Sequence, residues 1–159
     1  MGLRRLRAID RQELIAVYRD AVLSQTPGLY GPEQVRAWAD HAGQRPELFD
    51  ALEQRYGLAS EEGSGAIAAF GLLDRPAQQC ARLALLYCRG RCARQGHASA
   101  ILRALEAEAR RQHCRQLRTE ASQLSRPLLL RQGWRIERDE RLIFAGQPFL
   151  RWRMIKTLL

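Results

Sequence analysis

The feature that most constrains the fold is the succession of patterns between residues 80 and 121. An apolar strand-like segment over residues 80–88 leads into a short loop, a segment with helical periodicity, and a second strand-like segment over residues 116–121. Glu106 and Arg110 predict an i,i+4 ion pair on the outer face of that helix. Its apolar face is expected to comprise Ala98, Ile101, Leu102, Leu105 and Ala109. Strands and helices in this order favour a mixed α/β fold around one sheet.

Further strand-like patterns lie on both sides of this unit. They occupy residues 3–8, 56–61, 66–73, 133–144 and 149–156. The first of them is expected to be an edge strand. The next two flank the turn Gly63–Ser64–Gly65 and, with residues 80–88, predict a three-stranded antiparallel meander. We therefore expect an α/β (α+β) fold with a mixed, mostly antiparallel central sheet of six to seven strands and about four flanking helices.

Start signals predict the remaining helices. Asp10 stands three residues before Glu13, a spacing typical of a capping box, and apolar residues follow it at helical spacing. Pro32 and Pro46 each stand at a first helical position, where a missing amide proton costs nothing. Residues 127–132 predict a short helix.

Length and hydropathy limit the class of protein. The 159 residues suit a single domain over residues 1–159 with one core. No apolar run approaches the ~20 residues of a membrane-spanning helix, so we expect no membrane segment. The basic N-terminal residues are not followed by an apolar stretch, so we expect no secretion signal and a cytoplasmic protein.

The charge is strongly positive. The chain has 26 Lys and Arg against 17 Asp and Glu, a net charge of +9, and Lys156 is its only lysine. Arginine forms bidentate contacts with phosphate and carboxylate, so the excess favours an anionic partner: a phosphorylated cofactor, an acidic substrate or nucleic acid. The same composition is also typical of a surface of solvated arginines.

The four cysteines do not indicate a metal site. Cys80, Cys88, Cys92 and Cys114 lack the close pairing of zinc ligands, and a chain of this length does not need disulfides. We expect no metal and thiols that pack as small apolar side chains. An acyl-accepting role for Cys88 or Cys92 would need a base, and none stands beside either in the sequence.

The loop before the long helix is a candidate anion site. The first amides of a helix have no partner within the helix, and its dipole adds a partial positive charge at that end. Gly96 and Ala98 would let a phosphate approach the backbone, and Arg94 supplies a full charge. The alternative is a helix start whose small residues serve packing alone.

This loop and two other blocks resemble the GNAT acetyltransferase superfamily. The family's acyl-CoA motif is Q/R-x-x-G-x-G/A, and residues 93–98 read Ala-Arg-Gln-Gly-His-Ala, with Ala93 in place of the first motif residue. Residues 117–122 with 126–134 are similar to the family's fifth strand, fourth helix and following turn. The front end, with residues 18–22 and 30–35, is similar to small bacterial single-domain members.

The resemblance implies acetyl transfer from acetyl-CoA, as cosubstrate, to a primary amine by direct attack. It places the cofactor's pyrophosphate on the amides of Arg94, Gln95, Gly96, His97, Ala98 and Ser99. It pairs the pantetheine arm with backbone groups of Leu86, Tyr87 and Cys88, where the fourth and fifth strands part. A backbone amide of that segment would polarise the thioester carbonyl.

The resemblance also suggests catalytic residues. Glu120, near the end of the fifth strand, is the candidate base, directly or through water; the alternative is an ion-paired glutamate. The family's usual acid, a tyrosine of the fourth helix, is replaced by Leu128–Leu130. Ser122 or Tyr87 are candidate proton donors, with Ser125 as a further one. Their alternatives are helix caps for the serines and a core position for the tyrosine.

Two other functions stay open. The missing tyrosine, together with Ala93 at the first motif position, would suit a CoA-binding regulatory module with little or no activity. The net charge would suit a nucleic-acid-binding protein, although no stacking motif of aromatic and basic residues is present; a charged tRNA could also be the acetyl acceptor. The acceptor's identity stays open, and the terminal strands could pair in a homodimer.

Overall fold

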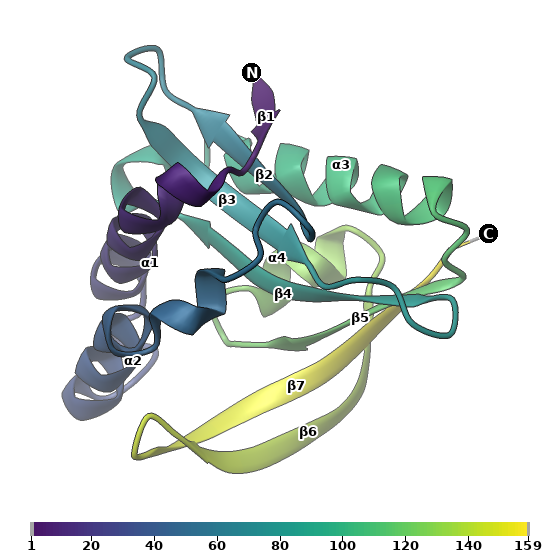
Figure 1. Cartoon of the computed structure of the whole chain (residues 1–159). Helices are drawn as coiled ribbons and strands as arrows, with labels where there is room; N and C mark the ends of the chain where they lie inside the picture. The colour runs from purple at the N-terminus through teal and green to yellow at the C-terminus, as the bar shows by residue number, and fades with distance from the viewer. Residues whose placement is uncertain (1, 159) are drawn as a thin grey trace.

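The structure, a computed structural model that describes residues 2–158, is built around one seven-stranded sheet (Figure 1). The order across the sheet is β1-β2-β3-β4-β5-β7-β6. Only β4 and β5 run parallel; the other neighbours are antiparallel. The strands are β1 (Leu3–Arg5), β2 (Tyr56–Glu61), β3 (Ile67–Leu73), β4 (Cys80–Cys88), β5 (Gln116–Ala121), β6 (Arg135–Phe144) and β7 (Gln147–Thr157). The predicted mixed, mostly antiparallel sheet is confirmed.

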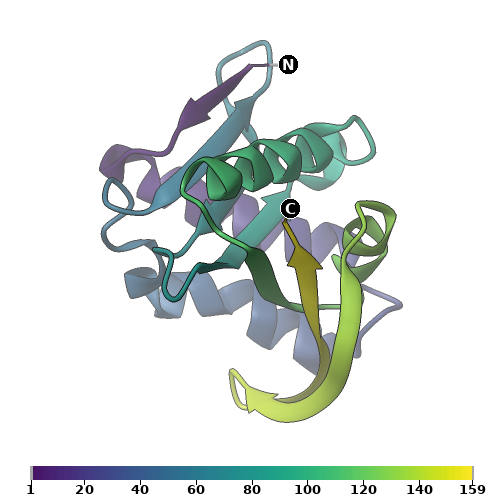
Figure 2. The ribbon, with the colours of Figure 1, turned by 90° about the vertical axis from the view of Figure 1, so that its right-hand side faces the viewer.

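In the part of the chain that the structure describes, four α-helices cover the sheet, two on each side (Figures 1 and 2). They are α1 (Arg11–Gln25), α2 (Pro32–Gln44), α3 (His97–Arg111) and α4 (Arg126–Arg131). On the side of α1 and α2, a core forms around Tyr18, Trp38 and Phe70. On the side of α3 and α4, a second core forms around Leu105, Leu117 and Trp134. None of the described helices combines the length and apolar character that crossing a membrane takes.

The start of the chain differs from the prediction. The edge strand ends at Arg5 instead of residue 8, and a 3-10 helix (Ala8–Asp10) follows it. The predicted capping box of Asp10 and Glu13 does not form. Asp10 accepts hydrogen bonds from the amide of Arg7 (2.8 Å) and the guanidinium of Arg4 (2.9 and 3.0 Å). Glu13 accepts the Ile67 amide of β3 (2.6 Å) instead. Each carboxylate is thus bound by a residue of the sheet, Asp10 by Arg4 of β1 and Glu13 by Ile67 of β3.

Two other details were wrong. Pro46 opens only a 3-10 turn (Pro46–Phe49), and the chain then turns through Ala51 with a φ of +53°. Glu106 does pair with Arg110 (2.7 Å), but this pair does not lie on an outer face, because Glu106 is buried and also binds Lys156 of β7 (2.8 Å). A buried carboxylate needs a partner, and the sequence pattern of one helix does not show a lysine from a distant strand.

A glycine of β3 lets α3 lie close against the sheet. A Cβ at Gly71 would stand 2.7 Å from Cγ2 of Ile101 and 3.0 Å from Cδ1 of Leu105, both fully buried side chains of α3. The absence of a side chain at this position therefore sets how α3, including its N-terminal end, sits on the strands.

We predict that Gly71→Ala destabilises the protein by about 1–3 kcal/mol, because the added methyl group overpacks the core between β3 and α3. Gly63→Ala is the control, since a Cβ there meets nothing within 4 Å and the change should stay within about 0.5 kcal/mol of the parent. Urea unfolding of both variants measures the effect. Equal stability of the two variants would contradict this account of how α3 is placed.

Candidate functional site

The central feature of the site is the point where β4 and β5 part. The two strands pair only over Cys80–Arg82 and Gln116–Arg118. Immediately beyond, the Thr119 hydroxyl donates to the carbonyl of Leu83 (2.7 Å). Further along, β4 has no strand on that side. A gap therefore opens at the carboxyl ends of two parallel strands, a common place for ligands in α/β sheets.

Backbone groups of β4 face this gap in an alternating pattern. The amide of Arg89 donates to Ala68 (2.8 Å), so Arg89 and, two residues earlier, Tyr87 direct their backbone groups toward β3. Leu86 and Cys88 direct theirs toward the gap. The Cys88 carbonyl already accepts the side-chain amide of Gln25 (2.6 Å). The amides of Leu86 and Cys88 and the carbonyl of Leu86 are left for a ligand. The predicted pairing of Tyr87 is wrong for its backbone, which β3 occupies.

The loop after β4 turns its amides outward. Arg94 has a φ of +61° and Gly96, the N-cap of α3, a φ of +89°. The first amide of the helix region to find a partner is that of Ala100, which donates to Gly96 (3.0 Å). Within the described residues 2–158, the amides of residues 94–99 donate to no protein group. Six amide donors are thus free to bind an acceptor at the N-terminal end of α3, where the helix dipole adds a partial positive charge.

A cavity of about 740 Å³ joins this helix end to the gap. Its volume lies in the range of small-molecule sites. Among the described residues 2–158, two arginines, Arg94 and Arg131, line it, and no carboxylate does. The other lining residues are Ser24, Gln25, Pro27, Leu29, Leu86, Tyr87, Cys88, Ala93, Gly96, His97, Ala98, Ser99, Gln123, Leu124, Ser125, Pro127 and Leu128. Free amides, two cations and the absence of acids fit an extended ligand with a phosphate group.

The side chain of His97 lines the cavity but is held by the sheet. It is 8% exposed, and its Nδ1 lies 2.7 Å from the hydroxyl of Ser60 on β2. The ring therefore does not face open solvent. Only the backbone of His97 contributes to the row of amides. The ring instead ties the first turn of α3 to the sheet.

Glu120 lies beyond the parting point and is ion-paired. Its Oε1 accepts a hydrogen bond from Nε (3.0 Å) of Arg82, the last paired residue of β4, and lies 2.8 Å from Nη2 of the same guanidinium. Burial favours the neutral acid, but the hydrogen bond from Arg82 and the charges of Arg82, Arg151 and Arg118 outweigh it, so the pKa of Glu120 is lowered. Glu120 is ionised at neutral pH and is a weak proton acceptor. It is nevertheless placed at the gap, because it lines two small cavities there.

Ser122 and Ser125 shape the entry to α4. The Ser122 hydroxyl accepts the amides of Leu124 (3.2 Å) and Ser125 (3.1 Å), so it does cap this turn. Its oxygen lies 3.3 Å from that of Ser125. Ser122 lines the cavities beside Glu120, and Ser125 also lines the large cavity. A capping hydroxyl that accepts two amides still has its own proton to donate.

The hydroxyl of Tyr87 lies in an aromatic cluster. It accepts the indole N–H of Trp38 (3.1 Å), and its ring packs on Tyr18 at 4.3 Å between centroids. Burial raises the pKa of Tyr87, which makes it a reluctant acid. Tyr87 lines all three cavities around the gap. Its ring therefore forms a wall of the site.

The cysteines near the gap are unreactive. All four are free thiols. Burial raises the pKa of Cys88 to about 11, and burial also raises the pKa of Cys92. Both are protonated at neutral pH, and the thiolate is the nucleophilic form. Among the residues described, no cluster of three or more His, Cys, Asp or Glu is placed to hold a metal ion.

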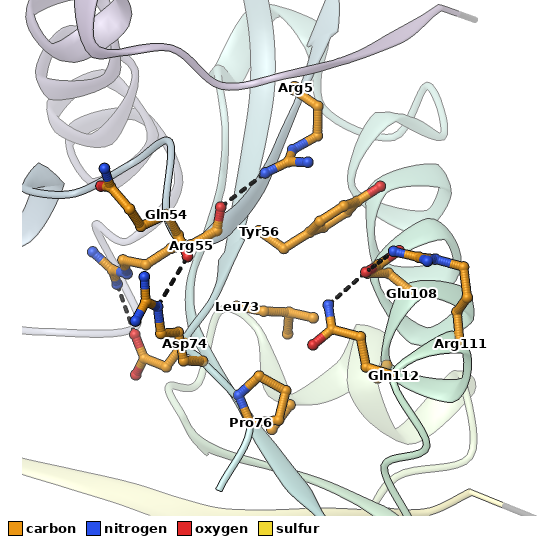
Figure 3. Close-up of a pocket in the computed structure, with 13 residues that line it drawn as sticks. Arg5, Gln54, Arg55, Tyr56, Leu73, Asp74, Pro76, Glu108, Arg111 and Gln112 are labelled. Carbon is orange, nitrogen blue, oxygen red and sulfur yellow. Dashed lines mark hydrogen bonds and ion pairs between the residues drawn. The ribbon is translucent and has the colours of Figure 1, made fainter.

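A separate cavity of about 260 Å³ lies at the other end of α3 (Figure 3). Its charged side chains pair with one another. Arg55 binds Asp74 (2.8 Å), Arg111 binds Glu108 (2.7 Å), and Arg5 donates to the carbonyl of Arg55 (2.9 Å). These arginines are occupied, unlike the amides at the start of α3. The charges around this cavity serve the fold.

Sequence reasoning missed the contribution of α1 and the loop that follows it. The amide of Gly90 donates to Asp20 (2.8 Å), and Gln25 binds the end of β4, so α1 holds the loop that precedes the free amides. Ser24, Pro27 and Leu29 line the large cavity. These side chains carry no motif, and only the packing of α1 beside β4 brings them to the site.

The comparisons with known proteins point to one family. The model of the acetyltransferase (GNAT) domain matches residues 28–156, which hold the gap and the start of α3. No curated protein sequence matches the chain. A GCN5-related N-acetyltransferase from Rhodopseudomonas palustris has the same fold, with a TM-score of 0.88 at 20% identity over 99% of this chain and 95% of that chain.

Two solved relatives contain a ligand of the coenzyme A type. The PaiA N-acetyltransferase from Thermoplasma acidophilum, in complex with coenzyme A, has a TM-score of 0.74 at 17% identity, covering 99% of this chain and 98% of that one. A phosphinothricin acetyltransferase from Sinorhizobium meliloti, in complex with AcCoA, has a TM-score of 0.70 at 16% identity, covering 99% and 88%. At these identities the likeness concerns the fold.

The ion pair of Glu120 predicts a pH-dependent stability. Because the folded protein lowers the pKa of Glu120, its contribution is complete above the unfolded value of about 4.3 and is lost as pH falls through the folded value. Glu120→Gln should therefore cost about 1–2 kcal/mol at pH 7, and this difference should shrink below about pH 4.

The measurement is the free energy of unfolding in urea between pH 3 and 7. Glu137→Gln is the control, because Glu137 is half exposed and lies 4.0 Å from Arg153. That variant should stay within about 0.5 kcal/mol of the parent at every pH. A difference for Glu120→Gln that does not change with pH would contradict the ion-paired state of Glu120.

Proposed function

The chain belongs to the GNAT acetyltransferase family, and on that premise we propose that it is an N-acetyltransferase, which transfers the acetyl group of acetyl-CoA to a primary amine in a ternary complex. The observation that carries this proposal is the row of free amides at residues 94–99, beside a cavity without acids that leads into the gap between β4 and β5.

The residues at the start of α3 are suited to bind the pyrophosphate. The amides of Arg94, Gln95, Gly96, His97, Ala98 and Ser99 would donate to it, and the left-handed Arg94 and Gly96 turn this backbone outward. The guanidinium groups of Arg94 and Arg131 would add charge at the rim. A nucleotide phosphate is the part of acetyl-CoA that such a site recognises.

The gap-facing groups of β4 are suited to hold the pantetheine arm and its thioester. The Leu86 amide and carbonyl and the Cys88 amide have no strand partner on this side, so they would pair with the amides of the arm as a neighbouring strand does. One of the two amides would also stabilise the negative charge that develops on the thioester oxygen. Tyr87 contributes its ring as a wall.

The groups around Glu120 are suited to handle the acceptor's proton. An amine attacks only in its neutral form, and ionised Glu120 would attract the ammonium and pass its proton on through water. The hydroxyl proton of Ser122, or of Ser125, could be donated to the leaving thiolate. A thiolate leaves readily, so a weak acid suffices at this step.

A specific observation also favours the second function, a CoA-binding module with little activity. The α4 segment that carries a tyrosine in related enzymes reads Leu128–Leu130, and the carboxylate beside the gap is paired with Arg82. Such a module would bind acetyl-CoA and release no CoA thiol with any amine. The measurements below separate the two functions.

Binding is tested by adding a charge at the helix start. Ala98→Glu places a carboxylate in the first turn of α3. The helix dipole stabilises a negative charge at this end, so the helix should tolerate the change, but the carboxylate would repel a bound diphosphate. We expect the Kd for acetyl-CoA to rise at least about tenfold, which corresponds to about 1.4 kcal/mol, without loss of thermal stability.

The matched control is Ser64→Glu, which adds the same charge in the exposed turn between β2 and β3. Its Kd by isothermal titration calorimetry should equal that of the parent. If acetyl-CoA bound both variants and the parent equally, or did not raise the melting temperature of the parent, the pyrophosphate site at residues 94–99 would be excluded.

Turnover is tested at Glu120. Glu120→Gln should lower kcat/KM for an amine acceptor by about 10²-fold, while the Kd for acetyl-CoA stays within about twofold of the parent value. Release of free CoA thiol measures the rate, and Glu137→Gln is again the control. Because the pKa of Glu120 is lowered, Glu120 does not titrate between pH 6 and 9. The rise of kcat/KM over this range should therefore reflect deprotonation of the acceptor amine, and it should persist in the variant. Full activity of Glu120→Gln would remove Glu120 from the mechanism.

A further inference from the structure

A small aromatic cavity adjoins the gap on the side of α2 and the β6–β7 hairpin. Its volume is about 130 Å³. It shares Trp38, Tyr87, Glu120 and Ser122 with the cavity inside the gap. The other lining residues are Tyr30, Ala121, Leu142, Phe144, Phe149, Leu150 and Arg151. This cavity therefore opens beside the place where the acceptor amine must stand in the proposed reaction.

The walls of this aromatic cavity are apolar because their polar tips are bound elsewhere. The indole N–H of Trp38 donates to the hydroxyl of Tyr87 (3.1 Å), and the hydroxyl of Tyr30 accepts the amide of Gln123 (2.9 Å). An apolar group between the rings is stabilised by burial, and polar groups of a ligand find partners at Glu120, Ser122 and Arg151 of the same lining.

The aromatic rings also support one another. Tyr30 lies edge-on to Trp38 at 5.4 Å and contacts Phe149 at 5.5 Å, and Phe144 lies edge-on to Phe149 at 5.6 Å. Two segments far apart in the sequence, residues 30–38 and the β6–β7 hairpin, thus build one preformed pocket. Since an apolar cavity of about 150 Å³ takes one benzene-sized ligand, this pocket has room for a single ring or a branched aliphatic group.

Two opposite charges stand at the edge of the aromatic cavity. Glu120 is ionised, and Arg151 is near enough for its charge to lower the pKa of Glu120. Arg151 donates through Nε to Glu140 (2.6 Å), while its two Nη atoms have no hydrogen-bond partner among residues 2–158. An ammonium beside Glu120 and a carboxylate on the Nη atoms would match this pair of charges.

We propose that the acetyl acceptor is a free α-amino acid with a compact apolar side chain, such as phenylalanine or leucine. Its side chain occupies the aromatic cavity, its carboxylate binds Arg151, and its amine stands beside Glu120. This assignment rests on the proposed N-acetyltransferase function and adds the chemical class of the acceptor. In the reaction, the amine nitrogen forms the bond to the acetyl carbon, the carbon–sulfur bond breaks, and the amine proton leaves as the thiolate gains one.

The first test compares acceptors with the parent protein. CoA release is measured with L-phenylalanine, L-phenylalaninamide, phenethylamine, L-alanine and L-lysine. We expect kcat/KM for phenylalanine to exceed the values for alanine and lysine, which lack an apolar ring, by at least tenfold. It should exceed the values for the amide and phenethylamine, which lack the carboxylate, by a similar factor. Preference for lysine, or no penalty for loss of the carboxylate, would overturn the assignment.

The second test uses three variants on the hairpin. Arg151→Met should raise KM for phenylalanine at least tenfold and bring it close to the KM for phenethylamine. Arg138→Met is the matched control, because Arg138 also lies near Glu140 (3.9 Å) but does not line the aromatic cavity, so its kinetics should match the parent's. Phe149→Ala should raise KM for phenylalanine and leave that for alanine unchanged. Equal effects of the two arginine variants would exclude a role for Arg151.

The outcomes separate the two proposals. If acetyl-CoA does not bind, or binds and is never turned over with any amine, the proposed N-acetyltransferase function fails and the assigned acceptor with it. If acetyl-CoA is turned over but a polar or cationic amine is preferred, the enzyme function stands and only the acceptor class is wrong. Melting temperatures of the variants show whether each is folded.

Discussion

The site depends on two side-chain bonds that span β4 and β5 where the strands part. The Thr119 hydroxyl donates a hydrogen bond to the carbonyl of Leu83, and Arg82 forms an ion pair with Glu120. The Thr119 hydroxyl gives the Leu83 carbonyl a partner where β5 turns away, and the Arg82–Glu120 ion pair joins the side chains of the two strands at the same point. The gap is therefore stable without a ligand, and the backbone of Leu86 and Cys88 stays open to one.

The same parting explains why the free amides and the acceptor pocket lie near each other. In a parallel pair both strands end at the same edge of the sheet, so the loop after β4 leads to α3 and the loop after β5 leads to α4 at one place. The cavity at the start of α3 and the aromatic cavity share Tyr87. A ligand in the gap can thus contact both.

Local patterns allowed much of the fold to be predicted. The bounds of β2, β4 and β5 were predicted to the residue, because alternating apolar residues and turn signals act over short distances. The small residues at 96 and 98 marked the helix start for the same reason. Several of the errors concern charged and polar side chains. Asp10, Glu13, Glu106 and His97 all bind partners on other elements, and no local pattern encodes such a partner. The complete set of rings around the aromatic cavity was not predicted, since they come from residues 30–38, from β4 and from the hairpin.

The ion pair of Glu120 has a consequence for how such a site could work without a tyrosine. A carboxylate whose pKa is lowered by Arg82 cannot hold a proton for long at neutral pH, so it favours proton transfer onward to water or to a nearby hydroxyl. The Ser122 oxygen accepts two amides, which polarises its O–H bond and favours donation. The negative charge of Glu120 favours loss of a proton from the amine, and the polarised hydroxyl of Ser122 favours donation of a proton to the sulfur. The two effects therefore promote the same reaction. A strong acid on α4 is then not required, because the thiolate is already a stable leaving group.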